Sequence, residues 1–363
     1  MKILLTCGGT GGHIIPAIAI ADMLSANLPD CEILFVGGES GMERALVTSA
    51  GYSIQTLDIR GLSRKNPFSL IASAFKTARA IKAAGTLIDQ FSPDIVIGTG
   101  GYACYPSLSA AIARGIPAAV HESNAVPGVA VRMLAPRLSR VWLGLEAACA
   151  YLPKRTQCLT VGNPLPRGFC IAQEGKREAR EKKIILSFGG SLGAPVLNAA
   201  VLDLMERTRS IPNVYHVHAT GKREWARFSE EMEKRGLLGN PRLEILPFIS
   251  DMPKRMLEAD VVICRAGAMT LGEVAMAGRA AVIVPSPNVT GDHQLKNAMA
   301  LAQKGAAILV EEKRIGEDFI PSVVSLLEND ARRRTLEQSV KAFAHPNANK
   351  EIYCDILSMV GQK

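Results

Sequence analysis

The stretch Lys2-Ile-Leu-Leu-Thr-Cys-Gly-Gly-Thr-Gly-Gly-His13 places a short apolar run directly before a turn rich in glycine. A second stretch, Lys183-Ile-Ile-Leu-Ser-Phe-Gly-Gly-Ser-Leu-Gly-Ala194, repeats this pattern in the other half of the chain. A buried strand that leads through a glycine turn into a helix is the repeating unit of parallel α/β sheets. The recurrence of this unit predicts two Rossmann-type domains in tandem.

Further short apolar runs continue the alternation along both halves of the chain. The runs that indicate buried parallel strands are Ile3–Thr6, Glu32–Val36, Asp94–Ile97, Ala118–Val120, Ile184–Ser187, Val214–His218, Leu243–Leu246, Val261–Cys264 and Ala281–Val284. Helical stretches between them predict a doubly wound α/β sheet in each half. We place the boundary near Val161-Gly-Asn-Pro164, which predicts domains at 1–161 and 162–345. A final helix at about 346–363 is expected to pack back on the first domain.

Composition narrows the class of protein. The chain has 363 residues, 48% of them hydrophobic, which is enough for two cores. Its eight cysteines are scattered without Cys-x-x-Cys spacing, so we expect reduced thiols and no zinc site. We find no signal peptide and no apolar run of the roughly 18 residues that span a membrane, so we expect a soluble or peripheral protein.

The net charge of +8 predicts a polyanionic partner, such as nucleotide phosphates or an acidic membrane surface. Aromatic residues make up only 5% of the chain, and no basic segment is interleaved with them. A protein that stacks bases on aromatic side chains needs such a segment, so nucleic acid is not an expected partner.

Three glycine-rich loops follow predicted strands, at 7–16, 98–106 and 187–194. Backbone N–H groups and the helix dipole at such turns favour phosphate, and glycine lets the ligand approach. None of the loops fits the dinucleotide fingerprint or the P-loop pattern, which disfavours an NAD enzyme and an ATPase. One such turn is equally well explained by tight strand–helix packing. Three of them favour one anionic ligand in each domain.

The segment Arg265–Glu273 also follows a predicted strand. Ala268–Thr270 would begin a helix whose first N–H groups lack partners within the helix. Glu273 would lie one turn inside, where its carboxylate could accept both hydroxyls of a ribose. Taken alone, Glu273 is better explained as a favourable acid in the first turn of a helix.

The loop Thr290–Asn297 places His293 and Gln294 before another predicted helix. Polar side chains in a loop flanked by glycine and proline suit sugar hydroxyls. The alternative is an ordinary loop in which Asp292 caps the helix.

The segment Arg60–Lys82 contains cations and no acid. Its cations are Arg60, Arg64, Lys65, Lys76, Arg79 and Lys82, and the interleaved apolar residues are Phe68, Leu70, Ile71, Phe75 and Ile81. A helix with an apolar stripe edged by cations suits an anionic bilayer surface. The alternative is an amphipathic helix that packs on its own sheet.

Six motifs in order along nearly the whole chain resemble those of the MurG family of glycosyltransferases, in glycosyltransferase family 28. They are Gly8-Gly-Thr-Gly-Gly-His13, Gly98-Thr-Gly-Gly-Tyr102, His121-Glu-Ser-Asn-Ala-Val-Pro-Gly128, Val161-Gly-Asn-Pro164, Ser187-Phe-Gly-Gly-Ser-Leu-Gly-Ala194 and Asp292-His-Gln294 with Asn297-Ala298. The resemblance implies a GT-B fold, in which two Rossmann-like domains face each other across a cleft.

The resemblance also implies the reaction. Members transfer N-acetylglucosamine from UDP-N-acetylglucosamine, with inversion, to the 4-hydroxyl of N-acetylmuramic acid in undecaprenyl-linked lipid I. The enzyme would be peripheral, on the cytoplasmic face of the inner membrane, with no obligatory cofactor. The residues carried over for the donor are Thr10, Gly11, Gly12, Asn124, Ser191, Ile249, Ala268, Met269, Thr270, Glu273, His293 and Gln294. The residues for the acceptor diphosphate are Gly100, Gly101 and Tyr102.

The chain departs from the family pattern at one donor position. The family usually has Gly-Asn-Pro-Val-Arg, whereas this chain has Gly162-Asn-Pro-Leu-Pro-Arg167. The arginine is displaced by one residue and Pro166 occupies its place. Either Arg167 reaches the donor from the shifted position or that contact is missing.

For the base that takes the proton of the acceptor hydroxyl, His13 is the first candidate, and His121 and Glu122 are its rivals. A histidine that ends a glycine loop has a suitable pKa for this task, but it could also simply order the loop. The chain has no Asp-x-Asp, so we expect no metal site and assign the leaving diphosphate to backbone N–H groups and helix dipoles. The alternatives are another UDP-sugar-dependent glycolipid glycosyltransferase, a nucleotide-sugar 2-epimerase, and a non-enzymatic scaffold that binds a nucleotide sugar.

Overall fold

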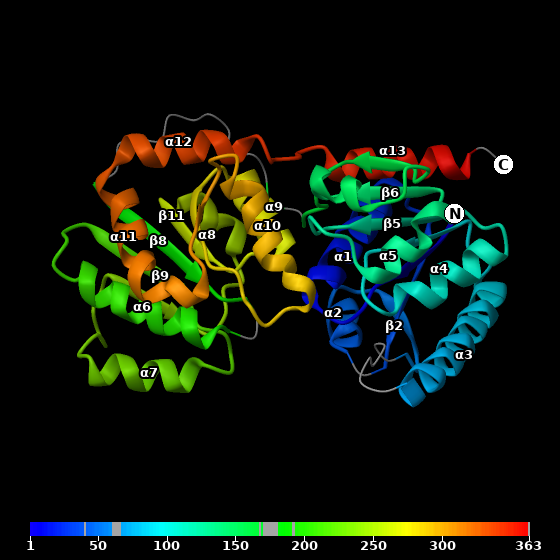
Figure 1. The fold of residues 1–363 in the computed structure, drawn as a ribbon, viewed down its shortest axis with the longest axis horizontal. Coiled ribbons are helices and arrows are strands. Elements are labelled where there is room, and N and C mark those ends of the chain that lie inside the picture. Colours follow the sequence, from blue (N-terminus) through cyan, green and yellow to red (C-terminus); the bar gives the residue numbers. More distant parts are fainter. Residues whose placement is uncertain (40, 60–66, 167, 170–180, 191–192, 362–363) are drawn as a thin grey trace. The chain divides into compact units, whose positions relative to one another are not determined.

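The computed structural model describes the chain except for residues 40, 60–66, 167, 170–180, 191–192 and 362–363 (Figure 1). Side chains are described from residue 75 onward in the helix that begins at Pro67. The chain forms two compact domains. The first comprises Met1–Arg167 and Asn347–Lys363, and the second comprises Gly168–Pro346. The division lies a few residues beyond the boundary expected at 161.

The first domain is one parallel sheet with helices. Its described strands are β1 (Lys2–Thr6), β2 (Glu32–Gly38), β3 (Ser53–Leu57), β4 (Ile95–Gly98), β5 (Ala118–Glu122), β6 (Arg140–Leu143) and β7 (Cys158–Thr160). Its described helices are α1 (Gly11–Asn27), α2 (Glu43–Ser49), α3 (Pro67–Phe91), α4 (Cys104–Ala113), α5 (Val129–Leu134) and α13 (Ala348–Val360), with short 3-10 turns at Ala135–Arg137 and Glu146–Tyr151.

The second domain repeats this arrangement. Its described strands are β8 (Lys183–Phe188), β9 (Val214–Ala219), β10 (Leu243–Leu246), β11 (Val261–Cys264), β12 (Ala280–Ile283) and β13 (Ile308–Leu309). Its described helices are α6 (Pro195–Thr208), α7 (Trp225–Lys234), α8 (Met252–Glu258), α9 (Ala268–Ala277), α10 (His293–Ala302), α11 (Ile315–Glu328) and α12 (Asp330–Lys341), with 3-10 turns at Thr290–Asp292 and Glu312–Arg314.

Both sheets are doubly wound. The strand orders are β3-β2-β1-β4-β5-β6-β7 and β10-β9-β8-β11-β12-β13, and every pairing is parallel. The order reverses between β1 and β4 in the first domain and between β8 and β11 in the second. Ligands of such sheets bind beyond the carboxyl ends of the strands at this reversal. The predicted pair of Rossmann-like domains is therefore confirmed, and each has its own reversal point.

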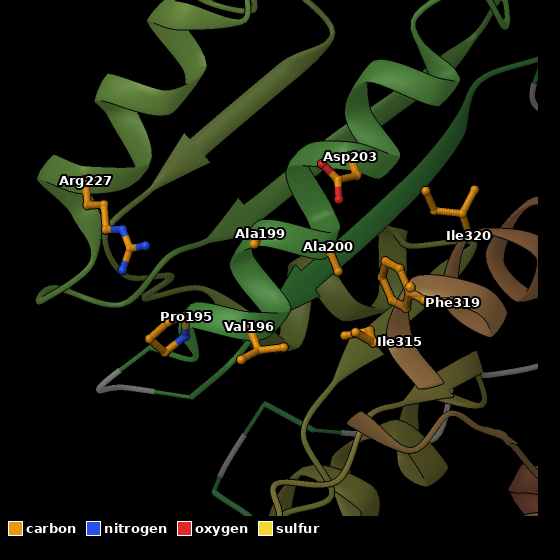
Figure 2. Close-up of a pocket in the computed structure, with 10 residues that line it drawn as sticks. Pro195, Val196, Ala199, Ala200, Asp203, Arg227, Ile315, Phe319 and Ile320 are labelled. Carbon is orange, nitrogen blue, oxygen red and sulfur yellow. The ribbon is translucent and has the colours of Figure 1, made fainter. Parts of the chain in front are cut away.

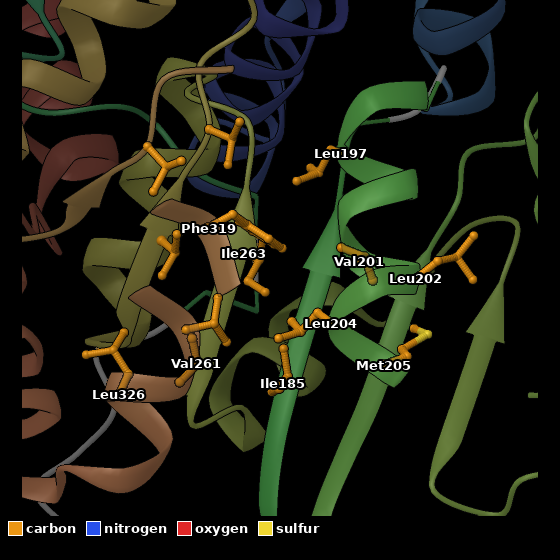
Figure 3. Packing of buried hydrophobic residues seen from close by; sticks show 14 of the residues in the cluster. Ile185, Leu197, Val201, Leu202, Leu204, Met205, Val261, Ile263, Phe319 and Leu326 are labelled. Carbon is orange, nitrogen blue, oxygen red and sulfur yellow. The ribbon is translucent and has the colours of Figure 1, made fainter. Parts of the chain in front are cut away.

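Apolar faces of sheet and helices form the cores. In the second domain, Ile185 of β8 and Ile263 of β11 pack with Leu197 of α6 and Phe319 of α11 (Figure 3). These four side chains are fully buried. A continuous apolar run with both faces covered is what a central parallel strand requires.

All nine strands predicted from apolar runs are present, to within a residue or two at their ends. Strands β3, β6, β7 and β13 were not predicted from the sequence. These strands lie at or next to a sheet edge, and β13 has only two residues. An edge strand is covered less completely, so its apolar signal is weaker. The burial of β3, for example, alternates between exposed and half-buried residues.

The last helix, α13, packs on the first domain. Ile352 and Ile356 are fully buried in the core cluster that contains β1 and α1. Asp355 on the same helix accepts hydrogen bonds from Arg140 Nε at 2.9 Å and from Trp142 Nε1 at 2.7 Å. The Trp142 indole is itself fully buried, so its N–H depends on Asp355 for a partner.

Candidate functional site

The first and second glycine loops interlock at the reversal point of the first domain. The first follows β1 and the second follows the neighbouring strand β4. A Cβ on Gly101 would lie 2.1 Å from Gly8 O, and one on Gly100 would lie 2.5 Å from His13 Nδ1. Both Gly100 and Gly101 also have positive φ, at 102° and 84°. Only glycine meets both conditions, so the sequence holds the two loops in backbone contact.

Thr99 joins His13 to the second loop by two hydrogen bonds. Its hydroxyl donates to His13 O at 2.6 Å, and its carbonyl oxygen lies 3.1 Å from His13 Nδ1. A carbonyl can only accept, so Nδ1 carries the hydrogen. In a neutral imidazole the lone pair is then on Nε2. The arrangement therefore fixes the tautomer in which Nε2 is the basic nitrogen.

His121 and Glu122, at the end of β5, hold other parts of the chain in place. His121 is fully buried, with Nε2 2.9 Å from Gly162 O and Nδ1 3.3 Å from Ser123 Oγ. Burial lowers the pKa of His121 to about 4. Glu122 accepts from the backbone and side-chain nitrogens of Asn124, both at 3.0 Å, and from Gly128 N at 2.8 Å. Glu122 thus orders the loop that carries Asn124.

The other candidates of the first domain lie in the same two loops. Thr10 is the N-cap position of α1, and the N–H groups of Gly11 and Gly12 make no backbone hydrogen bond among the described residues. Tyr102 lies against the first loop, because a Cβ on Gly9 would be 3.4 Å from its ring. In the first domain, the candidate residues therefore lie together beyond the carboxyl ends of β1 and β4. They are Thr10–Gly12, His13 and Gly100–Tyr102.

Ala268, Met269 and Thr270 form the first turn of α9 in the second domain, as predicted. This helix follows β11, which pairs with β8 at the reversal point. The loop after β8 contains Ser191, which lies outside the described residues, as does Arg167.

Glu273 lies one turn inside α9. The side chain keeps part of its surface accessible, and no hydrogen bond or ion pair joins it to another described residue. Desolvation by burial raises the pKa of Glu273 to about 8. A largely desolvated carboxyl group without a partner among the described residues is suited to a ligand that brings its own hydroxyl donors.

Ile249 and Gln294 come from other elements of the second domain. Ile249 follows β10 and is buried in the core cluster that contains Leu271 of α9. Gln294 is the second residue of α10, after His293, and its Oε1 accepts from Ser286 N at 2.8 Å. The amide group of Gln294 is thereby oriented by the loop that follows β12.

Thr99 is the site residue that sequence analysis did not single out. It stands inside the quoted second loop, but its role requires β4 to lie beside β1. A signal was available, because a hydroxyl residue next to two consecutive glycines on a neighbouring strand can reach an adjacent loop.

A cavity of about 360 Å³ lies between α6 and α11 (Figure 2). Apolar side chains such as Val196, Ile315 and Ile320 line it, with Asp203 and Arg227 beside them. None of the candidate residues lines this cavity, and we assign it no role in the reaction. Among the residues that the structure describes, no group of three His, Cys, Asp or Glu could hold a metal ion.

Comparison with known proteins places the two domains in one family. The model of the glycosyltransferase family 28 N-terminal domain matches residues 3–143, and that of its C-terminal domain matches 184–352. The chain belongs to glycosyltransferase family 28. Curated members of this family match it over nearly its whole length. The relatives from Acetivibrio thermocellus (35% identity, 97% of this chain and 96% of the relative) and Nitratidesulfovibrio vulgaris (39%, 96% and 94%) are both named UDP-N-acetylglucosamine–N-acetylmuramyl-(pentapeptide) pyrophosphoryl-undecaprenol N-acetylglucosamine transferase.

Solved structures agree with this assignment. The crystal structure of Acinetobacter baumannii MurG superimposes with a TM-score of 0.80 at 30% identity, covering 98% of this chain and 99% of that one. This similarity confirms the predicted GT-B fold. A putative UDP-N-acetylglucosamine 2-epimerase from Listeria monocytogenes also shares the fold, with a TM-score of 0.71, 15% identity and coverage of 100% and 97%. The fold alone therefore does not separate transferase from epimerase, whereas the family match does.

The interlocking of the loops predicts unequal effects of two glycine substitutions. Gly51→Ala keeps φ at 87° with no atom within 4 Å of the new Cβ, so we expect a loss of about 1 kcal/mol from backbone strain. Gly101→Ala adds the clash with Gly8 O, and we expect at least about 2 kcal/mol more. Urea denaturation of both variants measures the difference. Equal losses of stability would contradict the close approach of the loops.

The raised pKa of Glu273 predicts a pH-dependent stability. Between the unfolded pKa of 4.5 and the folded pKa of about 8, the folded state binds more protons, so this stabilisation is lost as pH rises. Relative to Glu273→Gln, the free energy of unfolding should fall by up to about 1.4 kcal/mol per pH unit in that range. Denaturation at a series of pH values measures it, and Glu233→Gln controls for the loss of an exposed carboxyl. A pH-independent difference would refute the assignment.

Proposed function

We propose that this enzyme transfers N-acetylglucosamine from UDP-N-acetylglucosamine to the 4-hydroxyl of N-acetylmuramic acid in undecaprenyl-linked lipid I, in peptidoglycan synthesis. The observation that carries the proposal is the match of both domains, over nearly the full chain, to relatives named for this activity. The enzyme is a hexosyltransferase.

The second domain provides the nucleotide part of the donor site in this proposal. The first turn of α9, at Ala268–Thr270, and the loop with Ser191 face the diphosphate, and Glu273 accepts the ribose hydroxyls. Ile249 meets the uracil through its backbone, and Gln294 with His293 binds the sugar hydroxyls. The carboxyl of Glu273 supports this assignment, because it has no partner among the described residues and ribose hydroxyls would satisfy it.

The first domain provides the catalytic base and the acceptor-binding residues in this proposal. Thr10, Gly11, Gly12 and Asn124 contact the donor, and Gly100–Tyr102 contact the diphosphate of the acceptor. The structural duties of His121 and Glu122 favour His13 as the base. Its Nε2 takes the proton of the 4-hydroxyl while the hydroxyl oxygen bonds to the anomeric carbon. The bond from that carbon to the diphosphate breaks, and UDP leaves with the electron pair.

The stability of the leaving UDP limits such a displacement, because negative charge grows on its diphosphate. Fixed N–H donors and the positive end of a helix dipole stabilise that charge without reorganisation. The α9 start, which lies at the reversal point of its sheet, offers both.

A lipid-linked acceptor requires contact with a membrane, and α3 offers a suitable face. Phe75 is 75% exposed, and Lys76, Arg79 and Lys82 are exposed at helical spacing around it. The opposite face buries Ala80, Ala84 and Ile88. We therefore propose peripheral attachment to an anionic membrane surface, on its cytoplasmic side.

The part of the predicted patch before residue 67 lies outside the described residues. No helix among the described residues is long and apolar enough to span a bilayer.

Radiolabelled UDP-N-acetylglucosamine, offered with a short-chain lipid I analogue, tests the proposed function. We expect a labelled lipid product that requires the acceptor. The same reaction without acceptor tests the epimerase alternative, because conversion to the 2-epimer of the donor needs no second substrate. Donor binding without labelled lipid would overturn the proposed function.

Replacement of His13 by alanine should lower turnover by about a hundredfold or more, because general-base catalysis contributes that much. The Kd for UDP should stay within about twofold of the wild-type value, since the nucleotide is held by the second domain. Steady-state kinetics and UDP titration measure the two effects. His345→Ala, a histidine outside every candidate set, is the control. Near-normal turnover of His13→Ala would remove His13 from the role of base.

Reversal of the charges on α3 should release the enzyme from anionic vesicles. In the variant Lys76→Glu/Arg79→Glu/Lys82→Glu, we expect a loss of binding by about tenfold or more, since each cation near the surface contributes about 1 kcal/mol. Co-sedimentation with vesicles of graded anionic lipid content measures it. The control Lys222→Glu/Lys304→Glu/Lys313→Glu makes the same change in net charge on exposed residues of the second domain. Equal loss in both variants would show that the α3 face has no special role.

A further inference from the structure

Glu43 is a buried acid that the proposed mechanism does not use. It is the first residue of α2, and its side chain is fully buried. Its Oε1 accepts from the Gly9 N–H at 2.7 Å, whereas Oε2 is buried without a hydrogen-bond partner among the described residues. An enclosed carboxylate is costly unless its contacts compensate. Its described hydrogen bond leads to the first glycine loop.

Three glycines near Glu43 leave room for its side chain because glycine has no Cβ atom. A Cβ on Gly8 would lie 3.0 Å from Glu43 Oε1, and one on Gly37 would lie 3.0 Å from Glu43 Cβ. A Cβ on Gly41 would lie 1.5 Å from Oε2. Gly8 and Gly41 thus leave room for the carboxylate itself, and Gly37 leaves room for the base of the side chain, so that Oε1 reaches the Gly9 N–H.

Gly9 is the residue at which the first loop turns. Its φ of 90° lies in the region that glycine enters freely, so its own backbone does not fix the course of the loop. The Glu43 carboxylate accepts a hydrogen bond from the Gly9 N–H, and the Tyr102 ring lies next to the Gly9 α-carbon. Gly9 is followed four residues later by His13, whose N–H bonds to Thr10 O.

We propose that Glu43 is a positioning residue of the transfer reaction, which fixes the first glycine loop through Gly9 and thereby sets the place of His13. The inference rests on the proposed function. A charge-assisted hydrogen bond is stronger and more directional than a neutral one, so the carboxylate restrains a turn that glycine leaves loose. A displacement of the base by about 1 Å is enough to cost about a hundredfold in rate.

The test compares Glu43→Gln and Glu43→Ala with the control Asp94→Asn. Glutamine keeps the shape and one acceptor oxygen but loses the charge, and alanine loses both. Asp94 Oδ2 accepts from the Lys2 N–H at 2.8 Å, at the end of β1 opposite to the loop. The control therefore weakens the same kind of bond in the same domain, away from the site. The measurements are kcat per UDP-binding site, acceptor KM, the Kd for UDP and the melting temperature.

We expect kcat per UDP-binding site to fall by at least about tenfold in Glu43→Gln and further in Glu43→Ala, with an unchanged Kd for UDP. Asp94→Asn should lose stability but keep its kcat per site. Wild-type kcat per site in Glu43→Gln would overturn the proposal, and so would failure of both Glu43 variants to fold, which would assign a purely structural role. Absence of lipid product from the wild-type enzyme would instead refute the proposed function.

Discussion

The close approach of two glycine loops is the constraint on which the rest of the first domain depends. Gly101 lies so near Gly8 O that a Cβ would overlap it at 2.1 Å, and this contact is possible only because β1 and β4 are neighbours. Once the loops touch, Thr99 can bond His13 from both its hydroxyl and its carbonyl. Backbone contact therefore decides which nitrogen of His13 carries the hydrogen, and the lone pair is left on Nε2, where the proposed base needs it.

The two domains share one framework and differ in the chemistry attached to it. Asp94 accepts from the Lys2 N–H and Asp260 from the Ile184 N–H, each at 2.8 Å, within one residue of the same place in the repeat. At the other end of the repeat, His13 of the first domain corresponds to Ala194 of the second. The domain that keeps the histidine can carry a base, whereas the domain with alanine has an acid, Glu273, in α9, which pairs with no other described residue. This division agrees with the proposal that the first domain provides the base and the second domain binds the nucleotide.

The fold, and the elements on which most candidate residues lie, could be predicted because their signals are local. A central strand such as β11 is a continuous apolar run, and Ala268–Thr270 follows it at once, so both were found. The roles of Thr99 and Glu43 were not predicted. That of Thr99 depends on which strands lie side by side, and that of Glu43 depends on missing Cβ atoms of glycines in neighbouring segments. Likewise, the sequence left His121 and Glu122 as rivals of His13, and only their hydrogen bonds to Gly162 and Gly128 separate the three.

The tautomer of His13 tests the central claim most directly, because in the proposed mechanism the interlocked loops act on the reaction through it. Nitrogen NMR of the enzyme labelled in its histidine rings reports which nitrogen carries the hydrogen in the neutral form, with His13→Gln to assign the signal. We predict hydrogen on Nδ1, bonded to Thr99 O, and a lone pair on Nε2. Hydrogen on Nε2 would contradict it, since the nitrogen assigned as base would then have no lone pair to accept a proton.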